Sequence, residues 1–270
     1  MMRVHLHTVC WNDAPRLDFF FRHYGPWIDR FFIHDDGSTD GSAERLASRP
    51  DVTLRKLERA HPESWVLSAK HIYDTSWQLS RGEADWVVIA NIDEHLHHPG
   101  MRRYLERMSA QGVTAIPALG FQMIERRTPQ ADSLLWRDHP HGAPWANMSK
   151  LQIFRPDRIA STDYAPGRHR VRFAGEVVLP ARDEVLNLHY KYLGLDETFE
   201  RHRQQAGRLG ALDLARRWGH KYLWDRETYE ADFEAHAGRA VDISSLTDPH
   251  AEHPEPRWWR RPGARLTIDD

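Results

Sequence analysis

The sequence has one cysteine among 270 residues and no long apolar run. Cys10 cannot form a disulfide within the chain, which indicates a reducing compartment. No stretch approaches the roughly 18 uninterrupted apolar residues of a membrane helix. The first residues, 1–7, lack the apolar segment of a signal peptide, and the mean hydropathy is −0.69. Together these absences predict a cytoplasmic protein.

The sequence also lacks an excess of charge of either sign. Its 37 Lys and Arg residues stand against 39 Asp and Glu residues, which gives a formal charge of −2. This balance argues against a chain-wide electrostatic grip on nucleic acid. The motifs of P-loop NTPases, dinucleotide-binding enzymes and α/β-hydrolases are absent as well. None of these classes is favoured.

Histidine and tryptophan, in contrast, are abundant, with 18 and 11 residues. His95, His97 and His98 fall within four residues, but neither a cysteine nor an H-E-x-x-H spacing accompanies them. We therefore expect these imidazoles to face solvent in a loop. A zinc-dependent hydrolase built on the histidine clusters stays open as a minor alternative.

The first 120 residues alternate between the hydrophobic periods of strands and of helices. This pattern predicts an α/β fold with a mostly parallel central sheet flanked by helices, because strand–helix alternation gives right-handed crossovers. The expected strands cover 4–9, 31–33, 52–57, 86–90 and 113–116, and the expected helices 17–24, 43–48, 64–80 and 101–108.

The second half is less regular. Residues 118–150 mix Pro, Gly, His and Trp, among them Trp136 and Trp145, which indicates long loops or a lid. Short strands are expected at 151–154 and 185–188, and helices at 196–218 and 225–236. We expect residues 1–195 to form the main domain, and 196–270 a C-terminal helical extension packed on it. The tail at 258–261, Trp-Trp-Arg-Arg, would dock on a membrane surface or a partner, or cap the domain.

Three polar segments each follow a predicted strand directly: Asn12-Asp13, Asp35-Asp36 and Asn91 to Glu94. Ligands of open parallel sheets bind beyond the carboxyl ends of the strands. The segments should therefore converge at one edge of the sheet, and this edge is the candidate site.

Asp35 and Asp36 open an acidic turn that ends at Asp40. Such carboxylates accept hydrogen bonds from a nucleobase or ribose and repel phosphate, although an isolated Asp-Gly-Ser is more often an Asx turn or helix cap. Asp93 lies where the chain leaves its strand, and one such carboxylate with substrate phosphates suffices for a hard cation such as Mg²⁺. A solvated turn is the alternative there.

Imidazoles and cations recur later in the sequence. Arg168 and His169 are adjacent, and His189 and Lys191 follow a predicted strand. Imidazole can bind a metal, and the cations can meet phosphate.

These motifs resemble the pattern of family 2 glycosyltransferases with the GT-A fold. The residues that carry the likeness are Trp11-Asn12-Asp13, the run from Ile33 to Ser42, and the run from Asp85 to Glu94. The last is similar to the D-x-D-E type of metal-binding segment. Later landmarks at 150–156, His169 and 189–192 are also similar, so the resemblance spans roughly residues 3–200.

The resemblance implies a GT-A fold and roles for individual residues. Asn12, Asp35, Asp36 and Asn91 would hold the nucleotide sugar, with Lys150, His169 and Lys191 at its diphosphate, while Asp93 and His189 would hold Mn²⁺ or Mg²⁺. The family usually has Asp where this chain has Asn91, which removes one negative charge from the metal site. A general base is implied but not singled out, and the candidates are Glu94, Glu125 and Asp163.

The function expected from these features is transfer of a sugar, a hexose or a related one, from a nucleoside diphosphate donor, with metal assistance and inversion. The acceptor would be a glycan, a lipid-linked molecule or a small molecule, as in cell-envelope or polysaccharide synthesis. Nucleic acid is not an expected partner, and the tail would allow peripheral membrane association. A non-catalytic nucleotide-sugar or glycan binder on a degenerate GT-A scaffold is the alternative.

Overall fold

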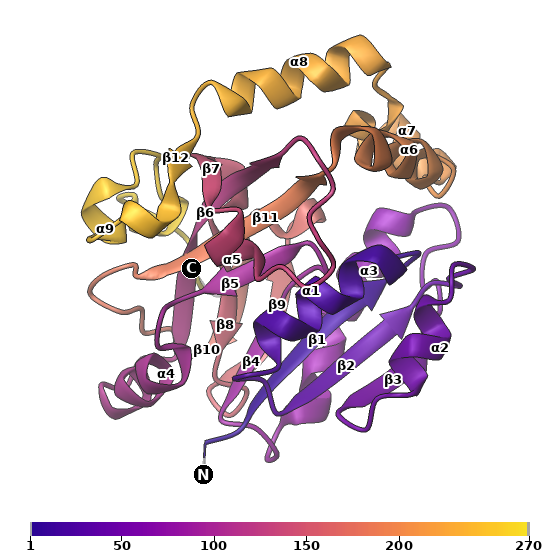
Figure 1. Ribbon diagram of the computed structural model, residues 1–270. Coiled ribbons are helices and arrows are strands. Elements are labelled where there is room, and N and C mark those ends of the chain that lie inside the picture. The colour runs from indigo at the N-terminus through magenta and orange to yellow at the C-terminus, as the bar shows by residue number, and fades with distance from the viewer. Residues whose placement is uncertain (1, 269–270) are drawn as a thin grey trace.

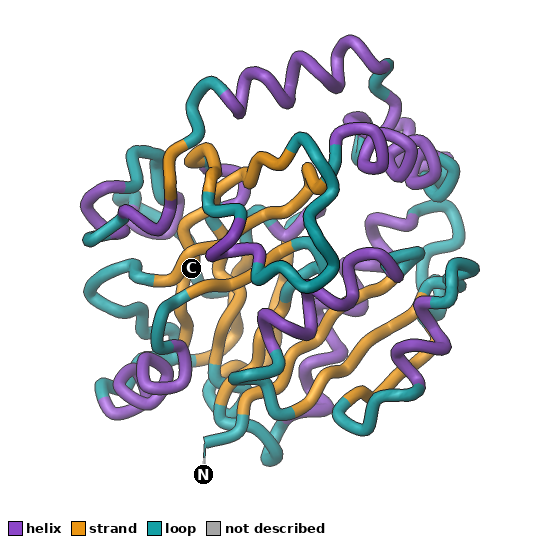
Figure 2. The backbone as a smooth tube through the Cα atoms, viewed as in Figure 1, coloured by secondary structure: helices purple, strands orange, loops and turns teal. Residues whose placement is uncertain are grey.

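One large mixed β-sheet with helices on both faces dominates the computed structural model, which describes residues 2–268 (Figure 1). Figure 2 shows the strands gathered in the centre and the helices around them. The strands are β1 (Val4–Cys10), β2 (Arg30–Asp35), β3 (Val52–Lys56), β4 (Trp86–Ile89), β5 (Glu94–His97), β6 (Ala115–Glu125), β7 (His141–Pro144), β8 (Lys150–Phe154), β9 (Ile159–Tyr164), β10 (Val171–Gly175), β11 (Val185–Leu193) and β12 (Val241–Asp242).

The sheet is parallel in its amino-terminal part and mixed beyond it. Strands β3, β2, β1 and β4 lie side by side in parallel, and the order continues through β8, β6, β7 and β12 by antiparallel pairs. Strand β11 joins β6 in parallel and β5 in antiparallel orientation, while β9 and β10 form a separate ribbon. The predicted α/β class, a mostly parallel mixed sheet flanked by helices, is confirmed.

The helices pack on both faces of this sheet. They are α1 (Ala14–Tyr24), α2 (Ser42–Ala47), α3 (Trp65–Thr75), α4 (Met101–Ala110), α5 (Leu135–Asp138), α6 (Leu195–Ala206), α7 (Ala211–Ala215), α8 (Arg226–Ala237) and α9 (Pro249–Glu252). Strand β4 shows the two layers: Val88 packs with α1 and α4, whereas Val87 and Ile89 pack with α3. Successive strand residues point to opposite faces, so an apolar strand such as β4 is buried on both.

Residues 118–150 are more regular than their composition indicates. Strand β6 continues to Glu125, pairs with β11 and β7, and is buried from Ala115 to Met123. Burial on both faces removes the alternation that would have revealed the strand. Gly120 interrupts the sequence pattern of the strand, and it is required there by packing, since a Cβ would lie 2.2 Å from the backbone of Met148. The expectation of loops is therefore wrong for residues 118–125 and 141–144.

The histidines at 95 and 97 lie on β5 rather than in a solvent-facing loop. His95 is 2% exposed, and its ring stacks on that of His23 with centroids 4.6 Å apart. Pairing of β5 with β11 buries the segment. The expectation of solvent-facing imidazoles is therefore wrong for His95.

The C-terminal extension crosses the carboxyl edge of the parallel strands and returns along the outside of the sheet through α8 (Figure 1). Its tail is folded onto the domain, because Trp259 is 3% exposed and Arg260 pairs with the buried Asp183 at 2.7 Å. Of the three alternatives predicted for the tail, Trp259 and Arg260 fit the one in which the tail caps the domain. No helix within residues 2–268 is long and apolar enough to cross a membrane.

Candidate active site

A cavity of about 600 Å³ lies at the carboxyl edge of the parallel strands. Asn91 and Asp93, which follow β4, line it together with residues of α3 and of the extension between 198 and 222. The edge predicted from the sequence thus holds a cavity, and the extension encloses it.

Positive charge dominates the lining of this cavity. The acidic groups among its described lining residues are Asp93 and Glu94, and both have cationic or imidazole partners. An anionic ligand is the natural complement of such a surface. Eight cationic side chains contribute: Arg16, Lys70, Lys150, Arg168, Lys191, Arg201, Arg217 and Lys221.

Glu94 is the centre of a buried ion-pair network. It contacts Lys150 at 2.8 Å and Arg168 at 2.7 Å, and the amide of Gln152 donates to it at 2.6 Å. Burial alone would raise the pKa of Glu94, but Arg168 and Lys150 outweigh it and hold the pKa at about 2. A carboxylate so fully engaged fits a structural role better than that of a general base.

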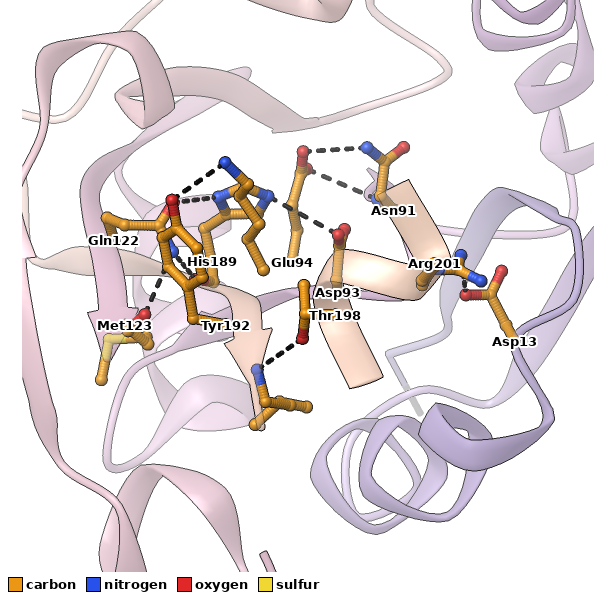
Figure 3. A network of polar contacts seen from close by, with 12 residues as sticks. Asp13, Asn91, Asp93, Glu94, Gln122, Met123, His189, Tyr192, Thr198 and Arg201 are labelled. Atoms are coloured by element: carbon orange, nitrogen blue, oxygen red, sulfur yellow. Dashed lines mark hydrogen bonds and ion pairs between the residues drawn. The ribbon is translucent and has the colours of Figure 1, made fainter. Parts of the chain in front are cut away.

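Asp93 and His189 face one another in the cavity, with Asp93 Oδ2 3.6 Å from His189 Nε2 (Figure 3). Burial opposes ionisation of Asp93, yet the cations Arg16 and Arg201 and, when it is protonated, the ring of His189 keep the pKa of Asp93 well below the usual value. The carboxylate is therefore ionised throughout the physiological pH range.

The tautomer of His189 follows from Gln122. The Gln122 amide nitrogen donates to the carbonyl oxygens of Met123 and His189, so its oxygen faces the ring and accepts from Nδ1 at 2.8 Å. The Nε2 atom faces Asp93 (Figure 3), and in the neutral ring a proton on Nδ1 leaves the lone pair of Nε2 directed toward that carboxylate. Two electron-pair donors then face each other beyond hydrogen-bond distance.

Such a pair fits a divalent cation that also binds substrate phosphates, because Mg²⁺ needs only one or two protein ligands besides phosphate and water. Asn91 is not free to assist: its Oδ1 accepts from Tyr73 at 2.6 Å and its Nδ2 donates to Glu94 at 3.2 Å. The described residues contain no group of three His, Cys, Asp or Glu that could hold a metal alone.

Three further predicted residues line the cavity. Lys150 reaches it from β8, Lys191 from β11, and His169 from the loop after the 3₁₀ turn η3 (Pro166–Arg168). The His169 Nδ1 atom lies 2.7 Å from the carbonyl oxygen of Asn147. The structure thus brings Asn91, Asp93, Glu94 and these three residues together with His189.

The first acidic motif is placed differently. Asp35 accepts from the backbone N–H groups of Gly37 and Ser38, both at 3.0 Å, and is occupied within its own turn. Asn12 accepts from the Thr39 N–H at 2.8 Å and holds two loops together. The described lining residues of the cavity do not include Asn12, Asp35 or Asp36. Asp36 is covered by Arg208 of the extension.

Two of the candidate bases lie outside the cavity. Glu125 contacts the Nδ1 atom of His139 at 2.5 Å at the end of β6. Asp163 belongs to a different groove and pairs with Lys70 and Arg172. Neither is among the described residues that line the cavity, so neither fits the role of a base there.

The sequence does not single out Arg16, Arg201 or Gln122 as residues of the candidate site. Arg201 pairs with Asp13 at 2.5 Å across 188 residues of sequence, and Gln122 supports His189 across 67. No local pattern signals such pairs. The one available hint was the density of arginines between residues 196 and 218.

No family model and no curated protein matches the chain. Several solved structures do. S. aureus TarS 1-349 is 11% identical with a TM-score of 0.39, over 75% of this chain and 64% of that one. Glucosyl-3-phosphoglycerate synthase from Mycobacterium tuberculosis, in complex with Mn²⁺, UDP and glucosyl-3-phosphoglycerate, is 20% identical with a TM-score of 0.36, over 62% of this chain and 61% of that one. The chain therefore spans less than two thirds of the length of either protein.

At such identities and scores, the chemistry of the site has to be argued from the residues of this chain alone. TarS 1-349 in complex with UDP-GlcNAc, 11% identical with a TM-score of 0.38, shows the same partial overlap, 75% of this chain and 65% of that one. Glycosyltransferases, the class of enzyme that the motifs resemble, are thus among the solved structures to which the chain is similar.

Proposed function

We propose that this chain is a glycosyltransferase that binds a nucleoside diphosphate sugar in the cavity and moves the sugar to an acceptor hydroxyl. The observation that carries the proposal is the pairing of Asp93 and His189 within a strongly cationic lining. A diphosphate with a bound divalent cation matches both features: the cation fits the Asp93–His189 pair, and the phosphates fit the cationic lining. The acceptor would be a glycan, a lipid-linked molecule or a small molecule.

The leaving diphosphate is stabilised by charge that is already in place. Asp93 and His189 would hold Mn²⁺ or Mg²⁺, which when bound supplies positive charge to the diphosphate oxygens. Arg16, Arg201 and Lys191 line the same cavity and add positive charge around the phosphate oxygens. Preorganised charge of this kind lowers the barrier to departure of the leaving group.

Direct, inverting attack needs a group that takes the proton of the acceptor hydroxyl. Both cavity carboxylates are engaged, so we assign this role to His169. Its Nδ1–H donates to the Asn147 carbonyl, which leaves Nε2 free to accept a proton. Partial desolvation by the surrounding cavity and then the charge of Lys150 lower the pKa of His169 to about 4, so the ring is neutral at pH 7.

The test is a donor screen with purified protein, in which release of nucleoside diphosphate from UDP- and GDP-sugars is measured with and without Mn²⁺. Asp93→Asn should reduce turnover at least about 100-fold and leave the circular dichroism spectrum unchanged. Asp157→Asn is the matched control, because Asp157 is exposed and pairs only with arginines. Absence of binding and of turnover with every donor would refute the proposal.

A non-catalytic binder is the second candidate, favoured by the lack of a free carboxylate among the described cavity residues. Calorimetry separates the two. Binding of UDP or GDP without turnover of any sugar donor, in the presence of carbohydrate acceptors, would support the binder.

A further inference from the structure

Arg208 of the extension is sandwiched between two indole rings. Its guanidinium carbon lies 4.3 Å from the ring centroid of Trp11 and 4.4 Å from that of Trp65. Its Nη2 atom lies 2.5 Å from Asp36 Oδ2, and the two side chains are 8% and 6% exposed. A planar cation thus fills a slot with aromatic faces and a carboxylate edge.

The slot lies where the sequence pattern places a nucleobase. Trp11 follows β1 and Asp36 follows β2, at the carboxyl edge of adjacent parallel strands. A nucleobase is also planar, stacks on indole faces, and donates from its edge N–H groups to a carboxylate. The guanidinium of Arg208 is therefore a structural substitute for a nucleobase: it is planar, it stacks between the two indoles, and its N–H groups donate to the carboxylate of Asp36.

Polar contacts hold the extension in this position. Arg201 donates to the Asp13 carboxylate and to the carbonyl oxygens of Trp11 and Asn12. Asp213 accepts from Ser64 Oγ and from the Trp65 N–H at the start of α3. The fit around Arg208 is incomplete, because its Nε is buried with no hydrogen-bond partner among the described residues. An unpaired buried donor weakens the arginine as an occupant of the slot.

We propose that Arg208 is an internal plug of the donor site, which the nucleobase of the donor displaces from between Trp11 and Trp65. The proposal rests on the proposed function for the identity of the ligand. Gly207 and Gly210 flank the turn that carries the plug. Because only the displaced form binds, the plug lowers the apparent affinity by the fraction of molecules that are open.

Calorimetric titration of Arg208→Ala with UDP and with GDP, each with Mn²⁺, tests the plug. The variant should bind the preferred nucleotide about tenfold more tightly than the wild type does. Arg203→Ala is the matched control, since Arg203 on α6 is exposed and pairs only with Glu200. Hydrogen exchange of wild-type residues 207–213 gives a readout that needs no variant, and nucleotide should accelerate it.

Unchanged affinity in Arg208→Ala, or slower exchange on binding, would overturn the plug and leave the donor site intact. Weaker binding would identify Arg208 as a ligand contact and overturn it equally. Failure of all three proteins to bind either nucleotide would remove the plug and the proposed function together.

A second groove, of about 640 Å³, lies across the Ala165–Pro166 segment from the donor cavity and shares Lys70 with it. Arg170, Arg261 and Arg265 line this groove, and none of the three guanidinium groups pairs with another described residue. Asp163, the acid among the described lining residues, is already held by Lys70 at 3.0 Å and Arg172 at 2.7 Å.

Unpaired guanidinium groups that converge on one groove are suited to oxyanions, because the planar fork matches phosphate and carboxylate bidentately. The Trp258 indole N–H, buried and without a partner in residues 2–268, adds a neutral donor. We infer that the groove binds a phosphate group of the acceptor, beside the donor cavity. Phosphate binding by the groove does not depend on the proposed function; only the identification of the bound molecule as the sugar acceptor does.

The indole N–H signal of Trp258 in a proton–nitrogen NMR spectrum, identified with Trp258→Phe, tests the groove. Inorganic phosphate represents a terminal phosphate and dimethyl phosphate a phosphodiester. A saturable shift with one of them is expected, with at least fivefold weaker binding in Arg261→Ala/Arg265→Ala. The exposed pair Arg103→Ala/Arg203→Ala is the control. No saturable shift, or equal binding by the two double variants, would overturn the inference, whereas UDP and GDP binding reports separately on the cavity.

Discussion

Two adjacent carboxylates, Asp93 and Glu94, have opposite surroundings. Asp93 faces an imidazole lone pair in the cavity, whereas Glu94 is enclosed by Lys150, Arg168 and Gln152. Sequence spacing cannot separate them, because both follow the same strand. The distinction comes from β8 and η3, which bring cations to one carboxylate only.

Replacing Glu94 should therefore damage the fold more than the chemistry. In Glu94→Gln the two cations Lys150 and Arg168 stay buried without a counter-charge, and loss of one partner of a buried pair costs about 3–5 kcal/mol. Urea unfolding followed by tryptophan fluorescence should show this loss. The exposed Asp157→Asn serves as control, and a Glu94→Gln protein as stable as the control would contradict the network.

Gln122 should govern the metal site through His189. In Gln122→Leu the Nδ1–H of His189 loses its acceptor, so the Nε2 lone pair is no longer fixed toward Asp93. Loss of such a supporting contact weakens metal sites about 10–100-fold. Titration of Mn²⁺ in the presence of saturating UDP, followed by electron paramagnetic resonance, measures the change. Affinity equal to that of the wild type would show that His189 is not a ligand.

At the scale of elements, hydrophobic periodicity correctly predicted those helices and strands whose formation depends mainly on neighbouring residues. The face of α1, with Leu17, Phe20 and Tyr24 buried, and the apolar strand β4 follow from periodicity. The continuation of β6 beyond residue 116 was not predicted, because this part is buried on both faces and contains Gly120, whose place is set by the backbone of Met148. The predicted division into residues 1–195 and 196–270 stays a prediction.

Part of the cavity could be predicted from the sequence, because several of its residues belong to the strands of the sheet or follow them directly. Asp93 follows β4, Lys150 begins β8, and His189 and Lys191 lie on β11, so the topology of the sheet brings these residues together. The extension above the edge could not be placed, because Arg201 and Arg208 bind partners about 190 and 170 residues away. Asp36 was expected at a ligand, and long-range pairing gives it Arg208 instead.

Asp213 is the element-scale link between the extension and α3. In Asp213→Ala the N–H of Trp65 and the hydroxyl of Ser64 lose their acceptor. We expect a loss of about 2 kcal/mol, the upper end for a helix cap, and faster trypsin cleavage between residues 207 and 221. Mass spectrometry of early fragments locates the cuts. Cleavage elsewhere first would mean that Asp213 does not anchor the extension.

For the whole molecule, the histidines matter less as ligands than as buried neutral groups. Burial lowers the pKa of several rings, and at His34 the neighbouring Arg55 lowers it further. The residues that are at most 7% exposed with a pKa of about 4 are His23, His34 and His236. In the unfolded chain each has a pKa near 6.5.

Acid should therefore unfold this protein at mild pH. Between pH 6.5 and 4 the unfolded chain binds protons that the folded protein does not, so the free energy of unfolding falls as the pH falls. The stability is fully present above pH 6.5, and each of the three rings accounts for a loss of about 3 kcal/mol by pH 4. Urea midpoints measured from pH 7.5 to 4.5 give the slope. His34→Gln should reduce the slope by nearly one proton near pH 5, and His71→Gln, at an exposed histidine, is the control. Equal slopes in His34→Gln and the wild type would mean that His34 titrates alike in both states.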